Sequence, residues 1–158
     1  MEGMRPSNNI GYLLNHMAFV LGRQSDQVLQ ERLGIGFSQF KIMMILQWKP
    51  NVQQKHIAEK LGQTEASISR QIKLLLDQGL LQTTRNPNNR REHITTLTAK
   101  GERFTSEAMD VLNNYHAPVF DALTEKQMAG LIESLTIMHR QTCTGDRPGA
   151  CHNVFEEK

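Results

Sequence analysis

The sequence predicts a mainly α-helical (α+β) fold in which a helix-turn-helix carries a two-stranded β-hairpin as a wing. Three patterns predict it. Residues 53–78 hold two short amphipathic segments separated by a glycine, and residues 80–98 hold two β-prone runs around a polar loop. Longer stretches with helical periodicity flank this core on both sides. The 158 residues fit one domain, spanning 1–158, with a substantial core.

Two helices are expected before the core. The first runs from Asn9 to about Arg32, because apolar residues recur there at helical spacing: Ile10, Leu13, Leu14, Met17, Leu21 and Val28. Ser38 is expected to cap a second helix that ends at about Trp48. We expect Trp48 to be a buried core residue beneath the helix-turn-helix, with a role in stacking on a ligand as the alternative.

The winged helix-turn-helix core is expected over residues 49–100. Its first helix carries three apolar residues on one face: Ile57, Ala58 and Leu61. Gly62 ends that helix with a positive φ, and Thr64 caps a second helix that Gly79 stops. The apolar face of the second helix consists of Ile68, Ile72, Leu75 and Leu76. Its opposite face is polar and basic, with Ser67, Arg70, Gln71 and Lys73.

Such a helix suits the major groove of B-DNA, which admits one helix and exposes hydrogen-bonding base edges. The segments LLQTTRN (80–86) and REHITTL (91–97) are then expected to pair as a hairpin, with residues 87–90 in the loop. Arg90 and Arg91 make the tip basic. Arginine is attracted into a narrow minor groove, so the helix and the tip are expected to bind neighbouring grooves.

The charge distribution favours the same interpretation. Residues 49–103 hold ten Lys or Arg against five Asp or Glu, a balance of +5, whereas residues 104–158 hold four against eight, a balance of −4. Positive charge is therefore concentrated where DNA phosphates would be contacted. The alternative is a solvated basic face without a partner.

The composition limits the other classes of protein. A hydrophobic content of 39% and a charged content of 22% are typical of a globular chain. Apolar runs such as 42–46 are too short to span a bilayer, and the first residues lack the pattern of a signal peptide. We therefore expect a cytoplasmic protein without membrane contact.

Two more helices are expected after the wing. One begins at Thr98 and is interrupted by Pro118, which lacks a backbone donor. The other opens at a capping box formed by Thr124 and Gln127. Its apolar stripe consists of Met128, Leu131, Ile132, Leu135 and Met138.

One chain gives the first helix and this last stripe little to pack against. The N- and C-terminal helices, residues 9–33 and 103–142, are therefore expected to form a dimerisation lobe with a second copy, followed by a C-terminal tail over 143–158. A two-fold dimer would present two recognition helices to successive major grooves, so the operator is expected to be a pseudo-palindrome in double-stranded DNA.

The run HIAEKLGQTEASISRQIKLLLDQGLLQTTRNPNNRREHITTLTAKG resembles the DNA-binding core of MarR-type transcriptional regulators. The helix-turn-helix, the exit at 79–81, the basic wing and the closing Leu-Thr-any-any-Gly motif (97–101) occur in the family's order, and a looser resemblance covers residues 8–142. One triplet differs. The family has Asp-any-Arg in the wing, whereas this chain has Asn89-Arg90-Arg91, so the ionic part of the hydrogen bond that orients Arg91 is lost.

The resemblance implies a homodimeric repressor that a small molecule or an oxidant releases from DNA, acting at the junction between the dimer lobe and the winged domains. We assign Ser67 and Arg70 to base edges and Ala66 to a thymine methyl. The remaining expected DNA contacts in and before the recognition helix are Thr64, Glu65, Ser69, Gln71 and Lys73. Those in the wing are Arg85, Asn89, Arg90 and Arg91.

Other classes of function find less support. The alternative to a DNA-binding regulator is a winged-helix module that binds protein partners instead of DNA. Catalytic motifs are missing from the sequence, and no cofactor is expected. The ligand spacing of His139, Cys143, Cys151 and His152 matches no common zinc site, so no metal is expected. A thiol switch at Cys143 or Cys151 stays an alternative, and His16 is a candidate pocket residue.

Overall fold

The structure is a computed structural model that describes residues 8–143, apart from the side chains of Arg91 and Glu92. Six helices and two strands follow one another within this range: α1 (Ile10–Leu33), α2 (Phe37–Trp48), α3 (Gln54–Leu61), α4 (Glu65–Asp77), β1 (Leu81–Asn86), β2 (Asn89–Leu97), α5 (Ala99–Phe120) and α6 (Glu125–Thr142). The predicted mainly helical fold with a helix-turn-helix and a hairpin wing is confirmed.

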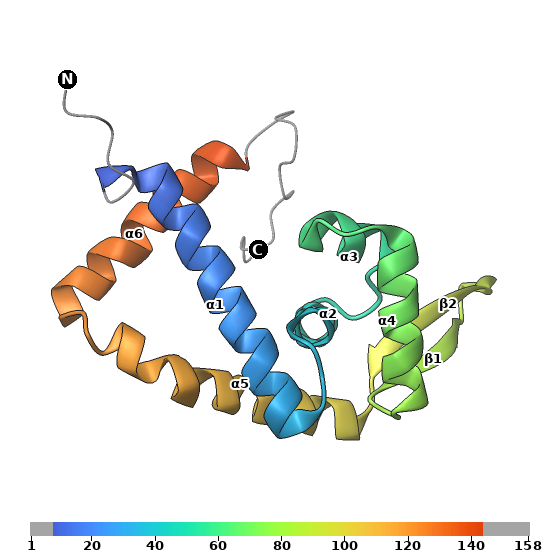
Figure 1. Cartoon of the computed structure of the whole chain (residues 1–158). Coiled ribbons are helices and arrows are strands. Elements are labelled where there is room, and N and C mark those ends of the chain that lie inside the picture. The colour runs from blue at the N-terminus through green and yellow to red at the C-terminus, as the bar shows by residue number, and fades with distance from the viewer. Residues whose placement is uncertain (1–7, 144–158) are drawn as a thin grey trace.

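The core of the chain is built around α2. In Figure 1, α2 lies between the long helices α1 and α5 and the winged part formed by α3, α4 and the hairpin. Four of its residues are buried: Phe40, Ile42, Met43 and Leu46. They belong to one cluster with Leu29 of α1, Ile57 of α3, Ile68 of α4 and Ala108 of α5. One hydrophobic core therefore joins the winged part to α1 and α5.

The start of α2 differs from the prediction. Ser38 does not cap it, because the helix already begins at Phe37 and its N-cap is Gly36. The first backbone donors are satisfied by other side chains: the Phe37 N–H donates to Asp26 Oδ1 of α1 (2.9 Å), and the Gly36 N–H donates to Gln39 Oε1 (2.9 Å). The Asp26 carboxylate, eleven residues upstream of Phe37, therefore caps the helix in place of Ser38. The Ser38 hydroxyl is left to bond another partner.

The predicted burial of Trp48 is wrong. Its side chain is 62% exposed at the end of α2. At about 100° of rotation per residue, Trp48 lies about 200° around the helix from the buried Leu46. Because Leu46 lies on the face of α2 that packs against the core, Trp48 lies on the opposite face and points outward.

Pro118 does not end α5, contrary to the prediction. The helix continues through Pro118 to Phe120. A proline removes only one helical donor, and the Asp121 N–H still donates to Ala117 O (2.8 Å). The two predicted helix starts are confirmed: Thr98 accepts from the Gly101 N–H, and α6 opens with the capping box of Thr124 and Gln127.

Candidate nucleic-acid interface

The recognition helix α4 is held by the turn that precedes it. Gly62 ends α3 with φ 61°, and Thr64 Oγ1 accepts from the Ser67 N–H (3.2 Å) at the start of α4. The helix buries Ile68, Ile72 and Leu75 and leaves Leu76 half-buried. The side chains left exposed are Glu65, Ala66, Ser69, Arg70, Lys73, Leu74 and Asp77. The predicted apolar and polar faces are therefore present.

Arg70 and Lys73 are the cations of this exposed face. Both side chains are exposed, and they lie three residues apart on α4. Within the described part of the chain, neither is paired with a carboxylate. Two cations that no carboxylate of the described residues neutralises can attract phosphates or donate to guanine.

Ser67 and Gln71 are arranged differently from the two cations. They are half-buried, and Ser67 Oγ and Gln71 Nε2 both donate to Gln63 Oε1 in the turn between α3 and α4. Gln63 also donates to Ser38 Oγ on α2. Gln63 is a residue of this site that the sequence did not predict. The only local signal for it is its position directly after Gly62, the glycine that ends α3.

The wing differs from the prediction at its tip. Its two strands are antiparallel, pairing Leu81 with Leu97 at one end and Asn86 with Asn89 at the other. Only Pro87 and Asn88 form the turn, where the Asn88 N–H donates to Asn86 Oδ1 (2.9 Å). The predicted four-residue loop is therefore wrong. The strand β2 begins at Asn89, two residues earlier than predicted, and the register shifts between Arg85, which pairs with His93, and Asn86, which pairs with Asn89.

The basic residues of the wing lie on strands and not in the turn. Arg85 of β1 and Arg90 of β2 are both exposed, and Asn89 begins β2. The Arg91 backbone belongs to β2, but its side chain lies outside the described part of the structure. The tip itself is polar and uncharged, and the positive charge stands beside it.

The base of the wing is joined to α5 by several hydrogen bonds. Thr98 Oγ1 donates to Gly79 O (2.7 Å), and Lys100 Nζ donates to Gln78 O (2.8 Å) at the end of α4. The Thr98 N–H donates to Leu80 O (3.1 Å). The recognition helix and the wing are thus both attached to the first turn of α5.

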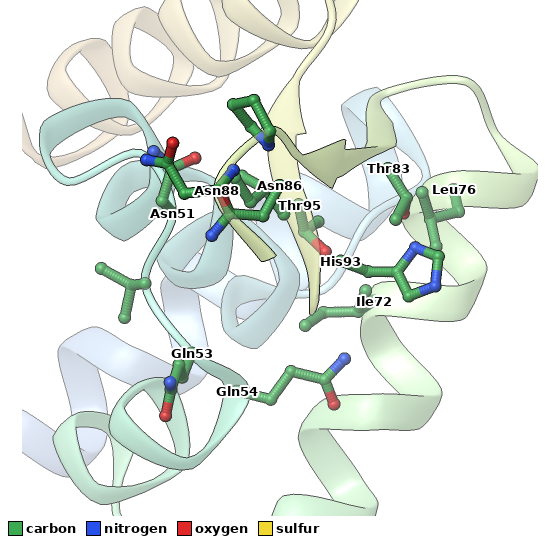
Figure 2. A pocket seen from close by; sticks show the side chains of 13 residues that line it. Asn51, Gln53, Gln54, Ile72, Leu76, Thr83, Asn86, Asn88, His93 and Thr95 are labelled. Carbon is green, nitrogen blue, oxygen red and sulfur yellow. The ribbon is translucent and has the colours of Figure 1, made fainter. Parts of the chain in front are cut away.

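A groove of about 510 Å³ separates the wing from the recognition helix (Figure 2). One wall is Ile72 and Leu76 of α4, and the strands contribute residues such as Thr83 and His93. The remaining lining is mostly neutral and polar, with side-chain amides from Asn51, Gln53, Gln54, Asn86 and Asn88. The groove therefore offers donors and acceptors without net charge.

A second cavity, of about 300 Å³, lies between α1 and α5. Its lining is mostly apolar and includes Leu21, Phe37 and Met109. The buried His116 lines it too; His116 Nε2 is 2.9 Å from Ser25 Oγ, while the buried Nδ1 has no hydrogen-bond partner in the described part of the chain. A cavity of this kind suits a small, largely apolar molecule with one polar group.

The candidate pocket residue His16 does not line either of these cavities. It is exposed on α1 and stacks on Tyr12, with ring centroids 5.6 Å apart.

Of the suggested thiol and metal residues, Cys143 is half-buried at the end of α6, whereas Cys151 and His152 lie outside the described residues. Among residues 8–143, no group of three metal-ligating side chains occurs, and each helix is too short or too polar to cross a bilayer.

Comparison with known proteins agrees with this geometry. Residues 37–93 match the sequence model of the MarR family. The chain is 26% identical over 108 residues to the HTH-type transcriptional regulator BilQ of Clostridium symbiosum, across 66% of this chain and 75% of BilQ. Its fold is similar to CouR from Rhodococcus jostii RHA1 bound to p-coumaroyl-CoA (TM-score 0.73, 18% identity, 98% of this chain and 100% of that chain). It is also similar to CouR bound to a 23-mer DNA duplex (TM-score 0.72, 23% identity, 88% of this chain and 100% of that chain).

Proposed function

We propose that this chain, whose residues 37–93 match the sequence model of the MarR family, is a sequence-specific DNA-binding repressor of that family that acts as a homodimer and is released by a small molecule. The observation that carries this proposal is α4 itself. Its buried face is fixed in the core, and its outer face presents Arg70 and Lys73 without internal partners among the described residues. A major groove accepts a helix with such a face.

The wing supplies the second contact of the proposed interface. Arg85 and Arg90 stand next to the uncharged turn at its end, and Asn89 lies beside them. When α4 occupies a major groove, the wing reaches toward the adjacent minor groove, where arginine gains from the more negative potential. Arg91 is assigned the same role from the sequence. The groove of amides between α4 and the wing would face the DNA backbone that separates the two grooves.

The proposal of a homodimer rests on apolar faces that the single chain leaves open. None of the residues of α6 is buried, and its exposed apolar side chains include Leu131, Ile132 and Leu135. Ile10 and Phe19 of α1 and Phe120 of α5 are exposed as well. A monomer seldom leaves so many large apolar side chains in water. A second copy would cover them and place two recognition helices for a pseudo-palindromic operator.

The cavity between α1 and α5 is the proposed effector site. It joins helices of the dimer lobe to Phe37 at the start of α2, and Phe37 packs against the hydrophobic core that α1 and α5 share with the winged part. A ligand there would release DNA only if it binds the DNA-incompetent arrangement of the two lobes more tightly. The related fold of CouR bound to p-coumaroyl-CoA supports a small molecule over an oxidant.

Selection of bound sites from a random DNA pool tests the proposal. We expect a pseudo-palindromic site, and we expect the affinity for it to fall steeply as salt rises, because bound phosphates release counterions. A winged-helix module that binds proteins would enrich no DNA sequence and would show no such salt dependence. Either of these two results would contradict the proposal.

Arg70→Ala is expected to weaken operator binding by about 1–3 kcal/mol, or about 5- to 150-fold, since the variant loses a donor to a base edge. Fluorescence anisotropy with the selected operator measures the loss. Arg32→Ala is the matched control, because Arg32 is an exposed arginine at the end of α1, outside the proposed interface. Equal affinities of Arg70→Ala and the parent protein would remove Arg70 from the interface.

A further inference from the structure

The hydrogen bonds around Gln63 determine which atoms of the recognition helix remain available to DNA. Gln71 Nε2 donates to Gln63 Oε1 (2.8 Å) and to Ser67 Oγ (3.2 Å). Ser67 Oγ donates to the same Gln63 Oε1 (3.2 Å). The amide of Gln71 has two N–H groups and the hydroxyl of Ser67 has one, so all three donors are used inside the protein.

What these two side chains can still offer is acceptor capacity. Gln71 keeps its Oε1, and Ser67 keeps a lone pair that the bond from Gln71 does not occupy. The orientation of the network follows from α2, because Gln63 Nε2 donates to Ser38 Oγ and thereby points Gln63 Oε1 toward α4. Since Ser38 sits on the helix at the centre of the core, the network is attached to a rigid element.

We propose that Gln63 is a positioning residue for base recognition: it turns Gln71 and Ser67 into acceptors that select adenine or cytosine and reject guanine. In the major groove, adenine N6 and cytosine N4 are donors, whereas guanine presents only the acceptors N7 and O6. Arg70 and Lys73, which are donors only, supply the complementary preference for guanine at neighbouring positions. This inference rests on the proposed DNA binding and adds a sequence preference to it.

The experiment compares site selection by the parent protein and three variants. Gln71→Met first identifies the operator position that Gln71 reads, because the preference at that position should disappear. Gln63→Met removes the network at similar side-chain length, which lets the Gln71 amide rotate. We expect Gln63→Met to remove the base preference at the operator position that Gln71 reads, with a loss of roughly tenfold in discrimination against guanine. The base preferences at the other operator positions should not change.

Gln63→Glu is the conservative variant. A carboxylate at this position can still accept from Gln71 and Ser67, and the bond to α2 can be kept with the Ser38 hydroxyl as the donor. It should keep the preference for adenine or cytosine while lowering affinity for all sites, because it brings a negative charge toward the phosphates. If Gln63 only stabilised the fold, Gln63→Met and Gln63→Glu would not differ in their base preference at this position.

Three outcomes would overturn the inference. The parent protein could prefer guanine at the position that Gln71 reads, Gln63→Met could leave the selected site unchanged, or Gln63→Glu could lose the preference as fully as Gln63→Met. In each case the parent protein still selects a site, so only the role of Gln63 is rejected. If the parent protein enriches no site at all, the proposed DNA binding fails, and this inference fails with it.

Discussion

Gly101→Ala is expected to lower the free energy of unfolding by about 3 kcal/mol or more, at the upper end of overpacking effects. A Cβ at this position would lie 2.0 Å from Leu80 O and 3.2 Å from Leu97 Cδ2. The Leu80 carbonyl cannot easily move away, because it accepts from the Thr98 N–H (3.1 Å) and from Thr98 Oγ1 (3.2 Å). The clash would push α5 away from the wing and from the end of α4.

Urea denaturation followed by circular dichroism measures this loss. Gly130→Ala is the matched control, since a Cβ there meets nothing within 4 Å in the described structure. Gly130 lies within α6, where alanine is the better helix former, so this control should gain up to about 1 kcal/mol. If Gly101→Ala unfolds at the same urea concentration as the parent, the close packing of α5 on Leu80 is not a determinant of stability.

Ile132→Asp combined with Leu135→Asp is expected to convert the proposed dimer to a monomer and to weaken operator binding on the order of 100-fold or more. Both side chains are apolar and exposed on α6, three residues apart on the helix. Two carboxylates there would have to be buried without partners if a second copy covered them. A monomer would bind each half-site independently and would lose the gain in affinity that comes from joining two recognition helices in one dimer.

Sedimentation equilibrium and anisotropy titration together measure this effect. Lys126→Asp is the control, because it changes the net charge by the same two units at an exposed position in the first turn of α6. The double variant should keep its helical content, since α6 buries none of its residues within the chain. A double variant that remains dimeric, or a parent protein that is monomeric, would place the apolar face of α6 outside the subunit interface.

The elements of the winged part were predictable because their signals are local. The apolar spacing of α4, the positive φ at Gly62 and the cap at Thr64 each depend on residues within one or two helical turns. The same holds for Thr98 and for the capping box of α6. Arg70 and Lys73 could be assigned to the exposed face for the same reason, since the buried face of a helix defines the opposite one.

The errors arose where a partner distant in the sequence decided the outcome. Asp26 of α1 replaced Ser38 as the side chain that satisfies the start of α2. The residue type of Trp48 predicts burial, whereas the packing of α2 on its neighbours leaves this side chain exposed. Pro118 predicts a break in the helix, but α5 continues through it, because a single missing donor does not stop a helix of this length.

Residue order was sufficient for the class of fold, the position of the recognition helix and its two faces, because hydrophobic periodicity and capping act over a few residues. Residue order does not predict the contacts of Gln63. They join the turn after α3 to Ser38, twenty-five residues upstream on α2, and to Ser67 and Gln71 on α4. Such a network exists only after three helices have packed together, and it is this packing that determines which donors and acceptors the protein presents.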